Sequence, residues 1–490
     1  MNAIVEPAVV SADTVARARR TLKSRRVKLP KFSELADPVG RLSASYDEIR
    51  QADPNAPDAR NLFRVHWYND ASGRGLSSVP GYLEIPRQLT GVNARIVVAL
   101  GRRFPMIAAH KVLPAYACLV PRLVTGRFDP ERNRAVWPST GNYCRGGVAI
   151  SRILGCRATA VLPEGMSVER FKWLEKWVAD PGDIFRTPGT ESNVKEIYDA
   201  CHQLSKNSDN VILNQFSEYG NYIAHRSVTG PAIKKIFDHI NTAGRLKARA
   251  FISASGSAGT LAAGDFLKQH LGTQTAVVEA LECPTLLRNG YGEHNIQGIG
   301  DKHVPLIHNV MGTDFVIAVS DHATDGLSVV YNTPEGRDYL ASHQGLSDAE
   351  ITSLGDLGLS GISNVLGAIK YSKYMNLGHD DVVLTVATDG AELYLTELET
   401  ARSKYFSRGL TPTSLAETFG RYLLGATTDS MLELSRLERE RIFNLGYYTW
   451  VEQQGVSLQD FDARRSQSFW DDLLALLPVW DDMIERFNAD

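Results

Sequence analysis

The chain has 490 residues, 43% of them hydrophobic, with 53 Lys and Arg side chains against 56 Asp and Glu side chains. This length suggests roughly two to four domains and ample material for a large core. The net charge of −3 favours neither a nucleic-acid partner nor a membrane surface.

The five cysteines form no C-x-x-C pair and no His-interleaved zinc pattern, and their odd number argues against a disulfide framework. They indicate reduced thiols in a cytoplasm. No apolar run approaches the roughly 18 to 20 residues that a membrane span needs, and the start of the chain lacks the order of a secretory signal. We therefore expect a cytoplasmic protein with no metal, nucleic-acid or membrane partner.

The first part of the chain predicts an arm. Residues 16–31 (ARARRTLKSRRVKLPK) are strongly basic, as in a transit peptide or a nucleic-acid arm. Acidic residues such as Asp13 and Glu34 interrupt this charge. We expect instead a surface helix, or an arm that packs on a neighbouring subunit.

From Asn61 onwards the pattern alternates between strands and helices. A helix is expected after Ser167, a residue suited to capping it. Repeated units of this kind predict a parallel sheet with helices on both faces. The expected strands are 96–98, 135–137, 157–162, 183–186, 211–214, 248–253, 276–280, 315–319 and 381–387.

Lys111 lies in a mostly apolar, helix-compatible run. An ammonium is costly to desolvate there unless it has a partner or chemistry to do, which makes Lys111 a candidate amine nucleophile. Taken alone, such a lysine is far more often an ordinary one whose head group reaches water. The polar turn Ser139-Thr140-Gly141-Asn142 begins after a short strand and precedes an apolar helix expected near Gly146, an arrangement that often binds ligands.

A glycine-rich loop, residues 254–260 (ASGSAGT), joins the strand 248–253 to an apolar helix. No Lys follows the glycines as in a nucleotide P-loop, so backbone N–H groups, hydroxyls and the helix N-terminus must bind any anion. Alone, this pattern also suits an ordinary tight turn. The segment 215–226 is expected to be irregular, and we expect the charged side chains His225, Arg226, Lys302 and His303 to be solvated.

Thr388-Asp389-Gly390 follows the last long strand, at the sheet edge where ligands of open α/β sheets bind. After Tyr394 the pattern is helical, without a strong strand. The aromatic residues of this tail predict core or interface packing rather than a binding site: Phe443, Tyr447, Tyr448, Trp450, Trp470 and Trp480.

These motifs extend from about Val79 to Tyr394. Their order and spacing resemble those of the cysteine synthase and cystathionine beta-synthase-like family of fold type II pyridoxal-phosphate enzymes. Further matches are 295–300 (NIQGIG) and 361–363 (GIS). The resemblance implies a tryptophan synthase beta-like α/β fold with two parallel or mixed sheets and flanking helices. It also implies an N-terminal arm (1–75), a core of two subdomains (76–395, the smaller about 105–225) and a helical C-terminal extension (396–490).

The resemblance also implies a site and a homodimer. Lys111 is the catalytic lysine that forms a Schiff base with pyridoxal 5′-phosphate, and Asn142 bonds the ring hydroxyl. The residues implied to hold the phosphate are Gly256, Ser257, Ala258, Gly259 and Thr260. Those implied to bind the substrate are Ser139, Thr140, Gly141, Tyr143 and Gly298.

The implied reaction is β-elimination or β-replacement on a small amino acid with a leaving group at Cβ, through an aminoacrylate. The alternatives are a hydroxy-amino-acid dehydratase and a catalytically silent homologue. A nicotinamide dehydrogenase is disfavoured because no strand is followed by G-x-G-x-x-G with an acidic residue about 20 positions later. The family usually has a small hydroxyl where Tyr143 stands, which argues against specificity for acetylserine.

Gly390 occupies the position at which family members commonly carry a serine that bonds the pyridine nitrogen. With no side chain there, we expect this nitrogen to face water or backbone unless Thr388 reaches it. Asp389 is expected to point away.

Overall fold

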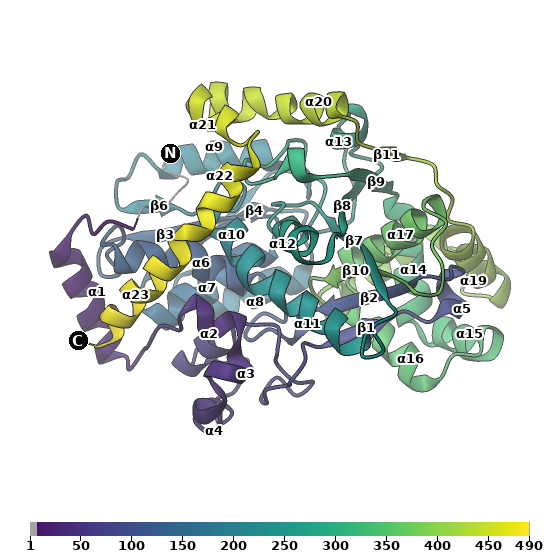
Figure 1. Ribbon diagram of the computed structural model, residues 1–490, viewed down its shortest axis with the longest axis horizontal. Coiled ribbons are helices and arrows are strands. Elements are labelled where there is room, and N and C mark those ends of the chain that lie inside the picture. Colours follow the sequence, from purple (N-terminus) through teal and green to yellow (C-terminus); the bar gives the residue numbers. More distant parts are fainter. Residues whose placement is uncertain (1–6, 490) are drawn as a thin grey trace.

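A computed structural model describes residues 7–489, whose strands form two sheets lying side by side (Figure 1). The larger sheet has the order β1 (Tyr82–Glu84), β2 (Arg95–Leu100), β10 (Asp381–Ala387), β7 (Lys247–Ala254), β8 (Gln274–Ala280), β9 (Phe315–Val319) and β11 (Met431–Glu433). The smaller sheet has the order β5 (Ile184–Thr187), β4 (Arg157–Pro163), β3 (Arg134–Pro138) and β6 (Asn210–Ile212).

Neighbouring strands in both sheets run parallel, except that β1 and β11 pair antiparallel at the two edges of the larger sheet. Central strands are buried almost throughout, as expected where helices cover both faces. Because β10 lies between β2 and β7, its carboxyl end brings Thr388 to the middle of the sheet edge. The expected strands are confirmed within a few residues at each end.

Two helices next to the smaller sheet begin directly at the functional motifs. The sequence pattern predicted a later start for the second of them. Lys111 directly precedes α6, and α7 begins at Asn142 rather than near Gly146. The cause is a tight turn, in which the Ser139 hydroxyl accepts a hydrogen bond from the Gly141 N–H at 2.9 Å. The helices of this region are α6 (Val112–Val124), α7 (Asn142–Leu154), α8 (Val168–Trp177) and α9 (Val194–Leu204).

The segment 215–226, which was expected to be irregular, is helical from Tyr219 onwards. It forms α10 (Tyr219–Ala224), a π-helical turn (His225–Thr229) and α11 (Gly230–Ile240). His225 and Arg226 are buried rather than solvated, because Arg226 donates a 3.0 Å hydrogen bond to the Trp470 carbonyl of the C-terminal segment.

Helices of the larger sheet cover it on both faces and continue beyond β9 (Figure 1). They are α5 (Arg87–Thr90), α12 (Leu261–Leu271), α13 (Thr285–Arg288), α14 (Asp321–Asn332), α15 (Pro334–Gln344), α16 (Asp348–Ser353), α17 (Leu359–Tyr374), α18 (Leu395–Tyr405) and α19 (Pro412–Phe419).

The two ends of the chain pack on each other and on the core. In Figure 1, α23 (Leu476–Ala489) crosses beside α1 (Ala12–Ser24) and α2 (Phe32–Ala36), and both contact it. The Tyr116 hydroxyl on α6 donates a 2.5 Å hydrogen bond to the Pro30 carbonyl. The described part of the N-terminal segment therefore lies on its own chain, while the first six residues of the expected arm lie outside the described residues. Short helices α3 (Pro38–Arg41) and α4 (Tyr46–Ile49) follow α2.

The C-terminal segment is helical except for β11. This strand has three residues, which is too short to give a strand pattern in the sequence. Its helices include α20 (Arg436–Tyr447), α21 (Leu458–Ala463) and α22 (Gln467–Asp472). Trp450, Trp470 and Trp480 are almost completely buried, which confirms packing rather than a binding surface, whereas Tyr448 is exposed.

Within residues 7–489, none of the helices is both long and apolar enough to cross a membrane. In the same range, no three His, Cys, Asp or Glu side chains come together in a way that could hold a metal ion.

Candidate functional site

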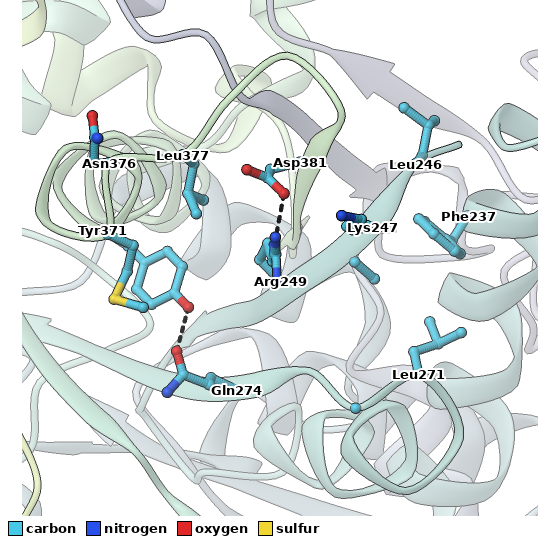
Figure 2. Close-up of a pocket in the computed structure, with 13 residues that line it drawn as sticks. Phe237, Leu246, Lys247, Arg249, Leu271, Gln274, Tyr371, Asn376, Leu377 and Asp381 are labelled. Atoms are coloured by element: carbon cyan, nitrogen blue, oxygen red, sulfur yellow. Dashed lines mark hydrogen bonds and ion pairs between the residues drawn. The ribbon is translucent and has the colours of Figure 1, made fainter. Parts of the chain in front are cut away.

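A surface groove lies at the amino ends of β7, β8 and β10 (Figure 2). Four of its polar side chains pair with one another: Arg249 bonds Asp381 at 2.6 Å, and the Tyr371 hydroxyl donates to Gln274 at 2.5 Å. Ligands of open α/β sheets bind at the opposite, carboxyl edge. We therefore place the candidate site at that opposite edge.

At the carboxyl edge, a cavity lies between the two sheets and brings together motifs that are far apart in the sequence. It is lined by His110, Lys111, Ser139, Thr140, Asn142, Tyr143, Gln215, Phe216, Ala254, Gly256, Ser257, Ala258, Gly259, Thr260, Gly298, Ile299, Ser360, Asn364 and Thr388. Of the residues that the sequence singled out for the site, Gly141 alone does not border it.

Lys111 presents its amine to this cavity. Its Nζ donates hydrogen bonds to Gln215 Oε1 at 2.9 Å and to Ser257 Oγ at 3.0 Å. Burial lowers the pKa of Lys111 to about 8, against the opposing effect of nearby carboxyls, of which Asp301 is the strongest. An amine with this pKa is partly neutral near neutral pH, as nucleophilic attack on a carbonyl requires.

Two buried histidines lie near Lys111, and one of them, His110, lines the cavity. The rings of His110 and His225 lie 5.1 Å apart, and burial lowers the pKa of His110 to about 3 and that of His225 well below its usual value. Both imidazoles are therefore neutral at physiological pH. Neutral and buried, they do not form an acid–base pair.

The glycine-rich loop between β7 and α12 is too crowded for side chains at two positions. A Cβ on Gly256 would overlap the Gly298 carbonyl, and a Cβ on Gly259 would overlap the Asn221 amide. Ala258 adopts a left-handed φ of 64°. The loop thus presents backbone amides and hydroxyls to the cavity, as a phosphate cradle does.

Gly141 and Tyr143 of the polar turn differ in their relation to the cavity, because Tyr143 borders it and Gly141 does not. Gly141, with φ of 143°, packs against the Arg170 side chain and away from the cavity. The Tyr143 ring packs against Trp137 at 5.4 Å, and its hydroxyl lies beside the Cys118 thiol. The phenol is therefore part of the core, where its apolar ring is buried.

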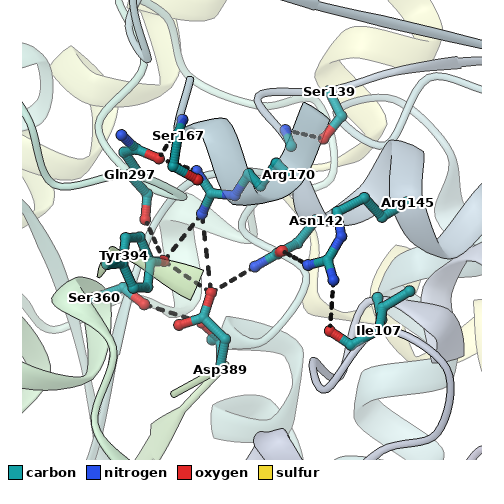
Figure 3. A network of polar contacts seen from close by, with 12 residues as sticks. Ile107, Ser139, Asn142, Arg145, Ser167, Arg170, Gln297, Ser360, Asp389 and Tyr394 are labelled. Carbon is teal, nitrogen blue, oxygen red and sulfur yellow. Dashed lines mark hydrogen bonds and ion pairs between the residues drawn. The ribbon is translucent and has the colours of Figure 1, made fainter. Parts of the chain in front are cut away.

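Asn142 is held from both sides (Figure 3). Its Nδ2 donates to Asp389 Oδ2 at 2.5 Å, and its Oδ1 accepts from Arg145 Nη1 at 2.9 Å. Arg145 is anchored in turn by a 3.0 Å hydrogen bond to the Ile107 carbonyl. The amide orientation is fixed, and one Nδ2 hydrogen is left for a ligand oxygen.

Asp389 does not line the cavity, in keeping with the expectation that its side chain points away. It is fully buried and accepts a 2.8 Å hydrogen bond from the Tyr394 hydroxyl, which accepts one from Arg170 at 3.0 Å (Figure 3). Arg170 also bonds Gln297. Asp389 therefore balances buried positive charge and supports Asn142 from outside the cavity.

The group that β10 presents to the cavity is Thr388 and not Gly390. The Thr388 and Ser360 hydroxyls are hydrogen-bonded at 2.9 Å, and both residues line the cavity. A side chain at Gly390 would meet Glu392 and Arg102 instead. This arrangement favours the alternative that the sequence left open, in which the Thr388 side chain reaches the cavity.

Two carboxyl groups near Lys111 escaped the sequence analysis. Glu191 follows β5 and is 1% exposed, and Asp301 follows Gly300 and is 6% exposed. Burial raises the pKa of Glu191 to about 7 and that of Asp301 well above its usual value. The segment before Asp301 is glycine-punctuated, which is a signal of a loop, whereas the loop of Glu191 has the single glycine Gly189. Gln215, also missed, follows the expected strand 211–214 and could have been found by that position.

Comparison with known proteins supports these observations. A family model described as "Pyridoxal-phosphate dependent enzyme" matches residues 83–350. Among curated proteins, cysteine synthase B of Campylobacter jejuni is 29% identical over 257 residues, covering 51% of this chain and 74% of the relative. A probable cysteine synthase of Bacillus subtilis is 28% identical over 283 residues, covering 57% and 82%.

Solved structures share the fold. A hydrogen sulfide-producing enzyme from Fusobacterium nucleatum has a TM-score of 0.53 and 22% identity, covering 64% of this chain and 96% of its own. The O-acetylserine dependent cystathionine beta-synthase from Helicobacter pylori has a TM-score of 0.52 and 20% identity, covering 64% and 94%. The expected two-sheet α/β architecture of fold type II is confirmed.

Proposed function

The chain belongs to the pyridoxal-phosphate dependent enzyme family, and from this premise we propose β-elimination or β-replacement on a small amino acid that carries a leaving group at Cβ. Its cofactor is pyridoxal 5′-phosphate, which when bound supplies an electron sink for negative charge at Cα. Relatives named cysteine synthase and cystathionine beta-synthase support this class of reaction.

One observation carries the proposal. The Lys111 amine donates a 3.0 Å hydrogen bond to Ser257 of the crowded loop, so a nucleophilic amine and an anion cradle lie in one cavity. These residues fit the cofactor: Lys111 would bond its aldehyde carbon, the loop 256–260 would hold its phosphate, and the remaining Asn142 N–H would meet its ring hydroxyl.

The substrate side of the cavity is polar but lacks an arginine among its lining residues. The hydroxyls of Ser139 and Thr140 and the Gln215 amide would bind the substrate carboxylate, and Gly298 lines the same cavity. Once its amine is free, Lys111 is the base that takes the proton from Cα. Its lowered pKa suits that role.

The assignment of Lys111 is tested by borohydride reduction of the holoenzyme followed by peptide mapping. The pyridoxyl group should be found on Lys111, and the Lys111→Ala variant should lose it. A pyridoxyl group on Lys172 or Lys302 would overturn the assignment.

The reaction is tested by supplying O-acetylserine, O-phosphoserine, cysteine, cysteate and threonine and measuring keto acid and ammonia. Release from at least one of the first four is expected. Release from threonine alone would favour a hydroxy-amino-acid dehydratase. A protein that takes up no cofactor and releases nothing would be a silent homologue.

We also propose a cytoplasmic homodimer without nucleic-acid or membrane partners. The five cysteines are buried free thiols, as suits a reducing compartment. Light scattering of the purified holoenzyme should give twice the chain mass, and a monomer mass would contradict the dimer.

A further inference from the structure

Four aromatic side chains join the cavity to the C-terminal segment, and we call them the aromatic cluster: Tyr198, Phe216, His303 and Trp450. Phe216 lines the cavity, and its ring meets those of His303 at 5.0 Å and Tyr198 at 6.2 Å, both in edge-to-face geometry. Trp450, in the π-helical turn Tyr448–Gln453, lies 5.8 Å from His303 and 6.2 Å from Tyr198. One layer of rings therefore separates a residue of the C-terminal segment from the cavity wall.

His303 connects the rings of the cluster and is half-buried rather than solvated, contrary to the expectation from the sequence, whereas Lys302 is exposed as expected. The His303 Nε2 is hydrogen-bonded to the Tyr198 hydroxyl at 3.0 Å. Burial lowers the pKa of His303 to about 3, so the ring is neutral at physiological pH. A neutral imidazole with a fixed orientation can transmit the position of one neighbouring ring to the next by packing.

The loop 303–307 is fixed from two sides. The Trp450 Nε1 donates a 2.7 Å hydrogen bond to the Val304 carbonyl. At the other end of the loop, the Ile307 N–H donates to the Phe216 carbonyl at 3.4 Å. The loop thus lies between the C-terminal segment and the residue that forms part of the cavity wall.

The backbone beside Phe216 has supports of its own, so the cluster acts mainly on the Phe216 ring. The Phe216 N–H donates to Asn214 Oδ1 at 3.1 Å, and Asn221 Nδ2 donates to the Gln215 carbonyl at 3.0 Å. These bonds keep Gln215 beside Lys111, whose amine donates to Gln215 Oε1. Loosening the cluster should therefore change the shape of the cavity wall while the Lys111 amine stays in place.

We propose, resting on the proposed function, that Trp450 is a positioning residue that holds the Phe216 ring through His303 and so sets how tightly the cavity binds the amino-acid substrate. Trp450 lies outside residues 83–350, which match the family model. The C-terminal segment then shapes the cavity as well as covering the core. A wall that contacts substrate equally before and during the reaction contributes uniform binding, so its displacement raises KM and leaves kcat unchanged.

The test compares Trp450→Phe with Trp480→Phe in the holoenzyme, using the amino acid that releases keto acid fastest. Trp450→Phe keeps an aromatic ring but removes the hydrogen bond to the Val304 carbonyl. Trp480 is also almost completely buried in the C-terminal segment, and its ring packs on Phe32 of the N-terminal segment. We expect KM to rise about five-fold in Trp450→Phe with kcat unchanged, and both constants to stay unchanged in Trp480→Phe. An unchanged KM in Trp450→Phe would overturn the inference.

The route through the cavity wall is tested by combining Trp450→Phe with Phe216→Leu. Phe216→Leu should raise KM by itself, and the added Trp450→Phe should raise it no further, because the ring that Trp450 positions is gone. If the two changes multiplied their separate effects on KM, Trp450 would act by another route and the inference would fail.

Should Trp450→Phe not fold, His303→Gln takes its place, because glutamine can keep a hydrogen bond to the Tyr198 hydroxyl but not the ring packing. The same rise in KM is expected, and an unchanged KM would overturn the inference. Binding without turnover is measured by calorimetry with L-alanine, which has no leaving group at Cβ. Its dissociation constant should rise about five-fold in the variant, and an unchanged constant would speak against the inference. Failure of the wild type to release keto acid from any amino acid would instead overturn the proposed function.

Discussion

The side-chain amide of Asn142 donates a 2.5 Å hydrogen bond to the carboxylate of Asp389, and so links the first residue of α7 to the end of β10. Asp389 also lies opposite two buried cations, Arg145 and Arg170. A single carboxylate thus compensates positive charge from two helices beside the smaller sheet while it orients a residue of the site.

The variant Asp389→Asn should be strongly destabilised, because it leaves buried arginine charge uncompensated at nearly constant volume. We expect a loss of about 3 to 5 kcal/mol in the free energy of unfolding, measured by urea titration. The matched control is Asp209→Asn, which removes the exposed ion pair with Arg132 and should cost about 1 kcal/mol or less. Equal losses in the free energy of unfolding would show that the contacts of Asp389 stabilise the protein no more than a surface ion pair does.

The lowered pKa of Lys111 predicts how cofactor uptake depends on pH. A protonated amine cannot attack the aldehyde, so the rate of holoenzyme formation from apoprotein should rise with pH and level off above about 8. An ordinary lysine, with a pKa of about 10.4, would give a rate that still rises beyond pH 10. Stopped-flow absorbance at constant ionic strength measures this rate, and Lys111→Arg serves as a control that should show no covalent uptake.

The crowding at Gly256 and Gly259 predicts that even a methyl group there weakens cofactor binding. Gly256→Ala and Gly259→Ala should each raise the dissociation constant of pyridoxal 5′-phosphate about ten-fold or more, because the loop must move to avoid the Gly298 carbonyl or the Asn221 amide. Gly420→Ala is the control, since nothing lies within 4 Å of its added Cβ. Equilibrium dialysis gives the constants, and unchanged values in the first two variants would remove the loop from the site.

The sequence predicted most of what local pattern determines. The strand 381–387 and the loop 256–260 were placed correctly because a buried β-branched run and a glycine-punctuated turn are local signals. The partner of Asp389 could not be predicted, because Asn142 lies 247 positions away in the chain and the hydrogen bond between them leaves no local signal.

The buried state of His225 and Arg226 had no local signal either. Arg226 is covered by Trp470 and Asp471, which lie more than two hundred positions later in the sequence. Charge alone suggested a solvated helix face. Tertiary packing of the C-terminal segment, which no periodicity can reveal, decided otherwise.

That packing predicts the result of truncating the chain after Glu399. Removal of the tail would expose the partners of Trp450 and Trp470 and leave β9 without its neighbour β11. The truncated protein should be insoluble, or aggregate on gel filtration, because such large apolar patches are not stable in water. A soluble, fully active enzyme of unchanged assembly size would refute this expectation.

The final prediction concerns the outcome of the reaction and rests on Thr388. Its hydroxyl, bonded to Ser360 at 2.9 Å, is the group that β10 presents to the cavity, whereas the neighbouring carboxylate of Asp389 is engaged by Asn142 and Tyr394. A hydroxyl can hydrogen-bond the ring nitrogen of the cofactor but does not hold it protonated. An unprotonated ring withdraws electrons weakly, so negative charge at Cα should be relieved by expulsion of the β-substituent.

We therefore expect elimination or replacement with negligible transamination, and the bound cofactor should stay an aldehyde after incubation with amino acids. Chromatography of the released cofactor measures pyridoxamine phosphate. Its steady accumulation would contradict this account. In Thr388→Asp a carboxylate would face the nitrogen and favour its protonation, which should raise the pyridoxamine phosphate yield about ten-fold, as a change of one pKa unit or more would. Thr388→Ser keeps the hydroxyl and should behave as the wild type, so a rise in both variants would trace the effect to altered packing instead of charge.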